Sequence, residues 1–209
     1  AASSVPVVLL TLIDPYDPRI DEVISRAEAL LIKVDWPTGE AMWHLAKGNV
    51  AKVRGEISEA LRQRSRAIAI ASKCGSRWVE LIANVTIPDD VNPSAPPRQR
   101  LANAVENLRT LLELNEKASL PIVIRSVVLS MVACENLETA ARCSAAVESL
   151  QGMGEDSKLN PQYDPTIEKM SDELGKERFA QLRQEGALLT PADIVDLGTK
   201  IVASTGEDV

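Results

Sequence analysis

The fold is decided by residues 38–75, which read TGEAMWHLAKGNVAKVRGEISEALRQRSRAIAIASKCG. Two helical stretches, 38–54 and 56–74, are each followed by a glycine, Gly55 and Gly75. Glycine adopts the left-handed backbone conformation that ends many helices, because it has no Cβ to clash. Small residues such as Ala60 recur along the second stretch, where they permit close helix packing. The segment therefore predicts two helices joined by a tight glycine turn.

The same pattern recurs downstream. A motif of Ile or Leu followed three residues later by Ala occurs at 57–60, 101–104 and 137–140. These spacings suit a repeat of helix pairs, although so short a motif also arises by chance in an alanine-rich chain. The layout resembles the tetratricopeptide repeat, which implies a first helix, a glycine turn and a second helix with small packing residues. It predicts first helices at 38–54, 76–87 and 121–134, second helices at 56–74, 98–118 and 137–151, and an earlier pair at 4–13 and 18–33.

We therefore predict an all-α fold, a tetratricopeptide-like α-solenoid of antiparallel helix pairs with a C-terminal helical cap. The pairs occupy residues 1–151. Residues 87–98 contain four prolines and cannot be helical, so they are predicted as an insertion loop rather than a domain boundary. Residues 152–209 are predicted as a linker and capping helices. Within them, Thr190 and Asp193 have the spacing of a capping box, with a proline at the first helical position.

The C-terminal part resembles a block found at the end of many large bacterial regulators. The stretches that carry the resemblance are 140–150, AARCSAAVESL, 174–180, LGKERFA, and 184–190, QEGALLT. They are similar to the helical region of LuxR-type and related ATPase regulators over about residues 137–200, and more loosely over 38–200. Ala145 stands where those regulators usually have glycine, and Arg183 where tryptophan is common. The resemblance implies a tetratricopeptide-like sensor or scaffold region. The chain carries no P-loop motif and no convincing helix-turn-helix.

Composition excludes several classes of function. The net charge of −7 argues against a surface that binds nucleic acid directly. One histidine and three cysteines cannot supply the common zinc ligand sets, and we predict no metal and no cofactor. No apolar run approaches the length of a transmembrane helix, and residues 5–13 lack the features of a signal peptide. An odd number of widely spaced cysteines suits a reducing compartment, so we expect a cytoplasmic protein. The chain begins at Ala1 rather than at methionine, which suggests a piece of a larger protein.

Six residues are candidates for a ligand- or partner-binding groove. They are Trp43, His44, Asn49, Lys52, Trp78 and Arg125. Rigid aromatic side chains are good anchors for a peptide or a flat ligand, and a histidine can act as a base. The alternative is that Trp36, Trp43 and Trp78 pack in the core and that His44 packs between helices. Arg125 lies among apolar residues and needs either an internal carboxylate or an anionic ligand.

Charge is unevenly distributed along the chain. Residues 47–78 contain eight basic and two acidic residues. This segment is either a docking face for an acidic partner or a solvated surface that faces acidic neighbours in the same fold.

The leading hypothesis is a protein-interaction or effector-sensing helical-repeat module, within a bacterial transcriptional regulator, that binds a protein, a peptide or a small effector. We expect no catalytic residues and no contact with a membrane. The alternative is a small-molecule-binding protein or enzyme that closes the same scaffold over a pocket. A homodimer is a further alternative.

Overall fold

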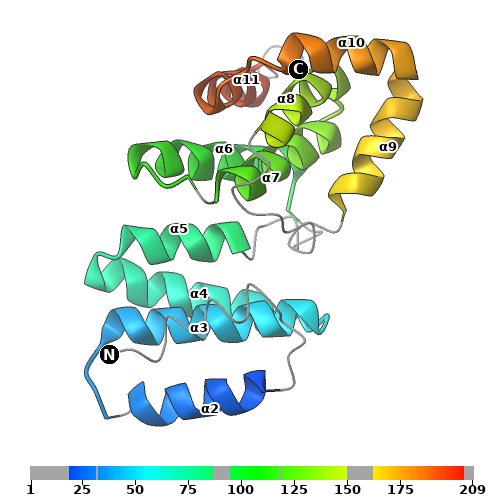
Figure 1. The fold of residues 1–209 in the computed structure, drawn as a ribbon. Coiled ribbons are helices and arrows are strands. Elements are labelled where there is room, and N and C mark those ends of the chain that lie inside the picture. The colour runs from blue at the N-terminus through cyan, green and yellow to red at the C-terminus, as the bar shows by residue number, and fades with distance from the viewer. Residues whose placement is uncertain (1–18, 32, 87–94, 118, 150–161, 205–209) are drawn as a thin grey trace. The chain divides into compact units, whose positions relative to one another are not determined.

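The computed structural model describes residues 19–31, 33–86, 95–117, 119–149 and 162–204. All regular elements in this part of the chain are α-helices, as Figure 1 shows. They form two compact units, residues 1–91 and residues 92–209.

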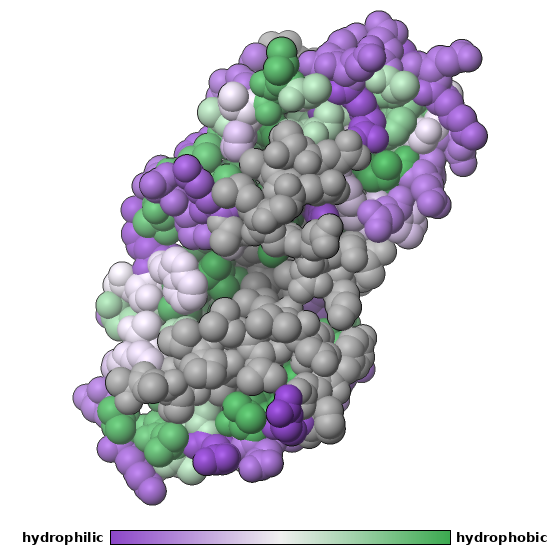
Figure 2. Space-filling model, in the orientation of Figure 1, coloured by the Kyte–Doolittle hydropathy of each residue, from purple (hydrophilic) through white to green (hydrophobic). Residues whose placement is uncertain are grey.

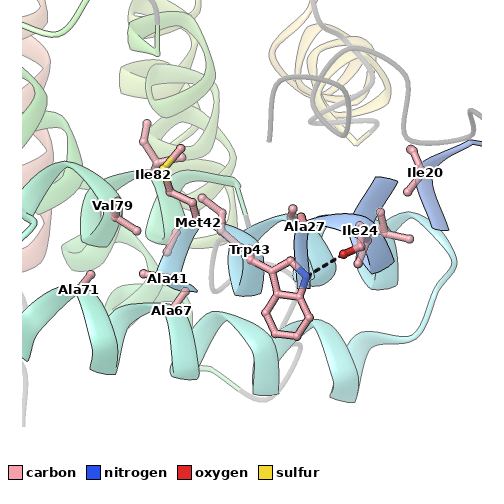
Figure 3. Packing of buried hydrophobic residues seen from close by; sticks show 14 residues of the cluster. Ile20, Ile24, Ala27, Ala41, Met42, Trp43, Ala67, Ala71, Val79 and Ile82 are labelled. Carbon is pink, nitrogen blue, oxygen red and sulfur yellow. Dashed lines mark hydrogen bonds between the residues drawn. The ribbon is translucent and has the colours of Figure 1, made fainter. Parts of the chain in front are cut away.

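Unit 1 contains the stretch that decides the fold. Its helices are α2 (Ile20–Leu31), α3 (Pro37–Val53), α4 (Ile57–Cys74) and α5 (Arg77–Thr86). Helices α3 and α4 lie side by side and make the most extensive helix contact of the unit, while α2 packs on α3, and α5 packs on α4 and α3 (Figure 1). The core is formed by aliphatic residues and alanines around Trp43 (Figure 3).

Two glycines end helices as the sequence predicts. Gly55 follows α3 with a φ of 77°, and Gly75 follows α4 with a φ of 72°. The Gly75 amide donates to the Ala71 and Ser72 carbonyl oxygens, which satisfies acceptors at the end of α4. The glycine turns therefore place α3 and α4 in contact.

Unit 2 begins within the proline-rich segment, at Asn92. Its helices are α6 (Pro97–Glu113), α7 (Leu120–Ala133), α8 (Leu137–Ser149), α9 (Tyr163–Leu174), α10 (Lys176–Gly186) and α11 (Pro191–Ala203). Helix α7 packs between α6 and α8, and the last helices return to them: α10 packs on α8, and α11 on α6.

Close contacts and a cap fix these last helices. A Cβ at Gly186 would lie 2.0 Å from the Arg142 carbonyl oxygen, so α10 can approach α8 this closely because residue 186 is glycine. The predicted capping box is confirmed: the Thr190 hydroxyl accepts from the Asp193 amide, and the Asp193 carboxylate accepts from the Thr190 amide. The Thr190 hydroxyl also donates to the Asp193 carboxylate at 2.6 Å, and this hydrogen bond, followed by the one from the Thr190 amide, lowers the pKa of Asp193.

The division between units differs from the predicted organisation. It falls at residues 91 and 92, inside the segment predicted as an insertion loop, whereas the predicted boundary followed residue 151. The physical reason is that α10 and α11, predicted as a separate cap, bury their apolar faces against α8 and α6. The predicted pair at 76–87 and 98–118 corresponds to α5 in unit 1 and α6 in unit 2. The helix expected at 4–13 and most of the linker lie outside the described residues.

Candidate functional site

A cavity of about 490 Å³ lies beside α2 and the start of α3 in unit 1. We call it the α2/α3 pocket. Its lining residues are Glu28, Leu31, Val34, Asp35, Trp36, Glu40 and Trp43. The volume is within the range typical of small-ligand and side-chain pockets.

Trp43 forms one wall and is held in place by the core. Its side chain is only 8% exposed, and its Nε1 donates to the Ile24 carbonyl oxygen at 3.2 Å (Figure 3). The Lys47 ammonium lies 4.6 Å from the centroid of the ring, a cation–π distance. The indole is therefore oriented from α2, and it already attracts one cation.

Trp36 forms a second wall and depends on a glycine. It is the N-cap residue of α3, with Pro37 at the first helical position. A Cβ at Gly39 would lie 2.1 Å from Cε3 of Trp36, so the indole occupies the space that any other side chain at position 39 would need. The absence of a side chain at Gly39 thus sets the position of Trp36.

The polar part of the lining carries only negative charge. Glu28, Asp35 and Glu40 are exposed carboxylates, and none forms an ion pair with a residue that the structure describes. Other acidic residues of the unit are paired: the Asp21 carboxylate accepts from Arg54 at 2.9 Å, and that hydrogen bond raises the pKa of the arginine. The pocket therefore combines indole and aliphatic walls with three carboxylates that form no ion pair with the described residues.

His44 does not line this pocket. It is 7% exposed and lies between α3 and α4, where its Nδ1 donates to Oε1 of Gln63 at 2.5 Å. The Gln63 amide in turn donates to Glu59 at 2.6 Å, and Arg62 also donates to that carboxylate. These two side-chain hydrogen bonds, that of Gln63 first, lower the pKa of Glu59. His44 therefore packs between two helices, which was the alternative to a role in a binding groove.

The other candidates are dispersed. Asn49 is buried in α3, and Lys52 is partly buried further along that helix. Trp78, on α5, is 43% exposed and is not among the pocket residues. Arg125 belongs to unit 2, where its guanidinium lies 5.4 Å from the centroid of the Tyr163 ring. Of the six predicted residues, the pocket contains Trp43 alone.

The basic segment 47–78 faces internal partners at several points. Arg54 pairs with Asp21 of α2, and Arg62 pairs with Glu59. Arg64 donates to the side chain of Asn84 at 2.7 Å. These contacts support the interpretation of a solvated surface that faces neighbours in the same fold.

Our sequence analysis missed the acidic residues of the pocket. A signal was present, because three carboxylates and two tryptophans occur between residues 28 and 43, with Lys33 as the one basic residue among them. Their convergence depends on the turn between α2 and α3, which the sequence pattern does not reveal.

Two kinds of feature are absent from the described residues. No helix there combines the length and apolarity needed to cross a membrane. No group of three or more His, Cys, Asp or Glu side chains in that part of the chain is arranged to hold a metal ion.

The chain was compared with known proteins at three levels. No protein-family model, no curated protein and no solved structure matches it.

Proposed function

We propose that this chain is a helical interaction module whose α2/α3 pocket binds a positively charged group with an apolar body. The observation that carries the proposal is the lining: two indoles, two aliphatic side chains and three carboxylates without ion-pair partners among the described residues. Indole faces attract cations, and carboxylates accept charge-assisted hydrogen bonds from them. A neutral ligand would gain no charge-assisted hydrogen bond from these carboxylates.

We further propose that the helices form a tetratricopeptide-like array of antiparallel pairs with a C-terminal cap. The glycine turn between α3 and α4, and the contact of α7 with α8, support the pairing. The packing of α10 on α8 and of α11 on α6 supports a capping role. The resemblance of residues 137–200 to LuxR-type regulators supports a sensor or scaffold role in a bacterial transcriptional regulator in the cytoplasm.

The alternative of an enzyme receives no support from the one histidine. A base needs access to a substrate proton, and His44 is instead buried against Gln63 outside the pocket lining.

The proposal is tested by titrating the protein with small cations. Butylguanidinium and butylammonium are the probes, and pentanamide is the neutral control. Tryptophan emission reports occupancy, because two of the three tryptophans line the pocket. We expect saturable binding of the cations that weakens with added salt, and no binding of the amide.

A matched pair of variants locates the site. Glu28→Gln with Glu40→Gln removes two charges from the lining, and we expect cation affinity to fall about tenfold. Glu22→Gln with Glu56→Gln removes two exposed charges of the same unit that lie outside the lining, and should leave affinity unchanged. Equal effects of the two pairs would refute the proposal.

A further inference from the structure

We propose that the group bound in the α2/α3 pocket is an arginine side chain presented by a peptide segment of a partner protein. This inference rests on the proposed function and names its ligand. It follows from three features: the mixed chemistry of the walls, their rigidity and the exposed apolar residues at the rim.

The wall chemistry favours a guanidinium over an ammonium. A guanidinium is planar and weakly hydrated, stacks on aromatic rings and donates in a fork to carboxylates. An ammonium is compact and strongly hydrated, and it binds as a point charge. The pocket offers both partners of the guanidinium at once, with the half-buried Trp36 as the flat surface and Glu28, Asp35 and Glu40 as acceptors. The Trp43 ring, which is 8% exposed and has the Lys47 ammonium against it, closes the inner wall. A cavity of about 490 Å³ also leaves much space around a bare ammonium.

The aromatic walls are held before any ligand arrives. The Trp43 indole is fixed by its hydrogen bond to the Ile24 carbonyl, and Trp36 occupies the space above Gly39. A site whose walls are already placed loses little conformational entropy on binding. Gly39 is therefore a positioning residue for the pocket: it sets the place of Trp36 without lining the cavity itself.

The rim favours a peptide over a free small molecule. Leu30, beside Leu31 in α2 but outside the lining, is 47% exposed, and Val34, at the edge of the lining just after α2, is 56% exposed. Hydrophilic and apolar residues are interleaved along the α2 edge of the face seen in Figure 2. A free guanidinium compound would fill the pocket and leave these side chains in water. The apolar residues next to an arginine in a peptide would cover them, and that burial is favourable.

The test compares blocked peptides by isothermal titration calorimetry. The first peptide is acetyl-Ala-Leu-Arg-Leu-Ala-amide. Its counterparts carry lysine or citrulline in place of arginine, and acetyl-arginine-methylamide represents the arginine alone. Citrulline keeps the shape of arginine but has no charge. We expect the arginine peptide to bind about tenfold more tightly than the lysine peptide and than the single blocked residue, and the citrulline peptide to bind weakest.

Two variants separate the walls from the rim. Gly39→Ala displaces Trp36, and we expect it to weaken the arginine peptide and the blocked residue alike, with the helix content by circular dichroism unchanged. Leu30→Ser alters an exposed residue of α2 that is outside the lining, and should weaken the peptide while leaving the blocked residue unaffected.

Each outcome has a distinct meaning. Equal affinity for the lysine and arginine peptides would overturn the arginine assignment and leave the proposed function standing. Equal affinity for the peptide and the blocked residue would overturn the peptide assignment and indicate a small guanidinium ligand. Failure of all cations to bind, with no difference between the two glutamine variant pairs, would refute the proposed function itself.

Discussion

Replacing Gly186 with alanine tests the packing of α10 on α8. The added Cβ would start 2.0 Å from the Arg142 carbonyl oxygen and 2.5 Å from its carbonyl carbon, whereas ordinary contacts begin at 3.4 Å. The opposing atoms are backbone, so no side chain can rotate away. Helix α10 must instead move by more than about one ångström relative to α8. Overpacking of this kind costs about 1–3 kcal/mol.

The net effect is smaller than the clash alone. Alanine is favoured over glycine in a helix by up to about 1 kcal/mol, and less at the last residue of α10. We therefore expect a loss of about 1–2 kcal/mol, which lowers the melting temperature by roughly 3–10 °C in a unit of this size. Domains of this kind have about 5–15 kcal/mol of stability, so the variant still folds.

Urea unfolding followed by two probes measures this loss and its location. Far-ultraviolet circular dichroism reports all the helices, while the three tryptophans, at positions 36, 43 and 78, report unit 1 alone. We expect the Gly186→Ala variant to shift the dichroism transition. The transition in tryptophan emission then shows whether the stability of unit 1 also falls.

Ala180→Gly is the matched control. Residue 180 is exposed on the same helix, so only helix propensity acts there, and glycine should cost up to about 1 kcal/mol. We thus expect glycine to be the more stable residue at position 186 and alanine to be the more stable residue at position 180. If alanine stabilises position 186 as it does position 180, the close approach of α10 and α8 is wrong.

Three further predictions follow from buried and capping groups. Gln63→Leu removes the acceptor of the buried His44 Nδ1–H and should destabilise unit 1 by about 1–3 kcal/mol, seen as a lower urea midpoint by tryptophan emission; an unchanged midpoint contradicts the hydrogen bond. Because the folded pKa of Asp193 is lowered, its contribution to stability is present above the unfolded pKa and is lost as the pH falls through the folded one. Asp193→Asn should therefore show a smaller loss of stability between pH 6 and pH 3 than the parent chain, and equal losses would refute the capping assignment. Burial raises the pKa of Cys143 to about 12, so iodoacetamide at pH 8 should label the exposed Cys74 much faster, as mass spectrometry of the digested protein will show; comparable labelling would contradict the burial.

The sequence predicted helix ends well where a glycine turn or a capping residue marks them. Gly55, Gly75 and the Thr190 capping box each mark a terminus that the structure confirms. The ends of α6 and α7 are different, because residues without glycine's freedom adopt the left-handed conformation there: Asn115 has a φ of 51° and Glu135 a φ of 61°. The helix predicted at 98–118 therefore ends earlier, at Glu113. Asparagine is enriched in this conformation, so Asn115 is a local signal for the end of α6, whereas Glu135 carries no such signal.

The grouping of helices was harder to predict than the helices themselves. A repeat motif indicates which helices are alike, and we used it to pair the helix at 76–87 with the one at 98–118. Packing depends instead on which apolar faces meet. Helix α5 buries Val79 and Ile82 in the core of unit 1, and Gly198 of α11 fits against Val105 of α6 in unit 2. Both contacts join segments far apart in sequence.

The candidate site also could not be predicted from local sequence alone. Sequence reasoning selected residues by type, and so favoured His44 and Arg125, which are rare or out of place in an apolar context. Such residues are more often satisfied inside the protein, as His44 is by Gln63. The pocket is instead built from common carboxylates, whose significance lies in what they lack. Glu28, Asp35 and Glu40 form no ion pair with the described part of the chain, while Asp21 and Glu59 do. Whether a carboxylate has a partner depends on three-dimensional neighbours, and so the property that indicates a ligand becomes visible only once the helices are packed.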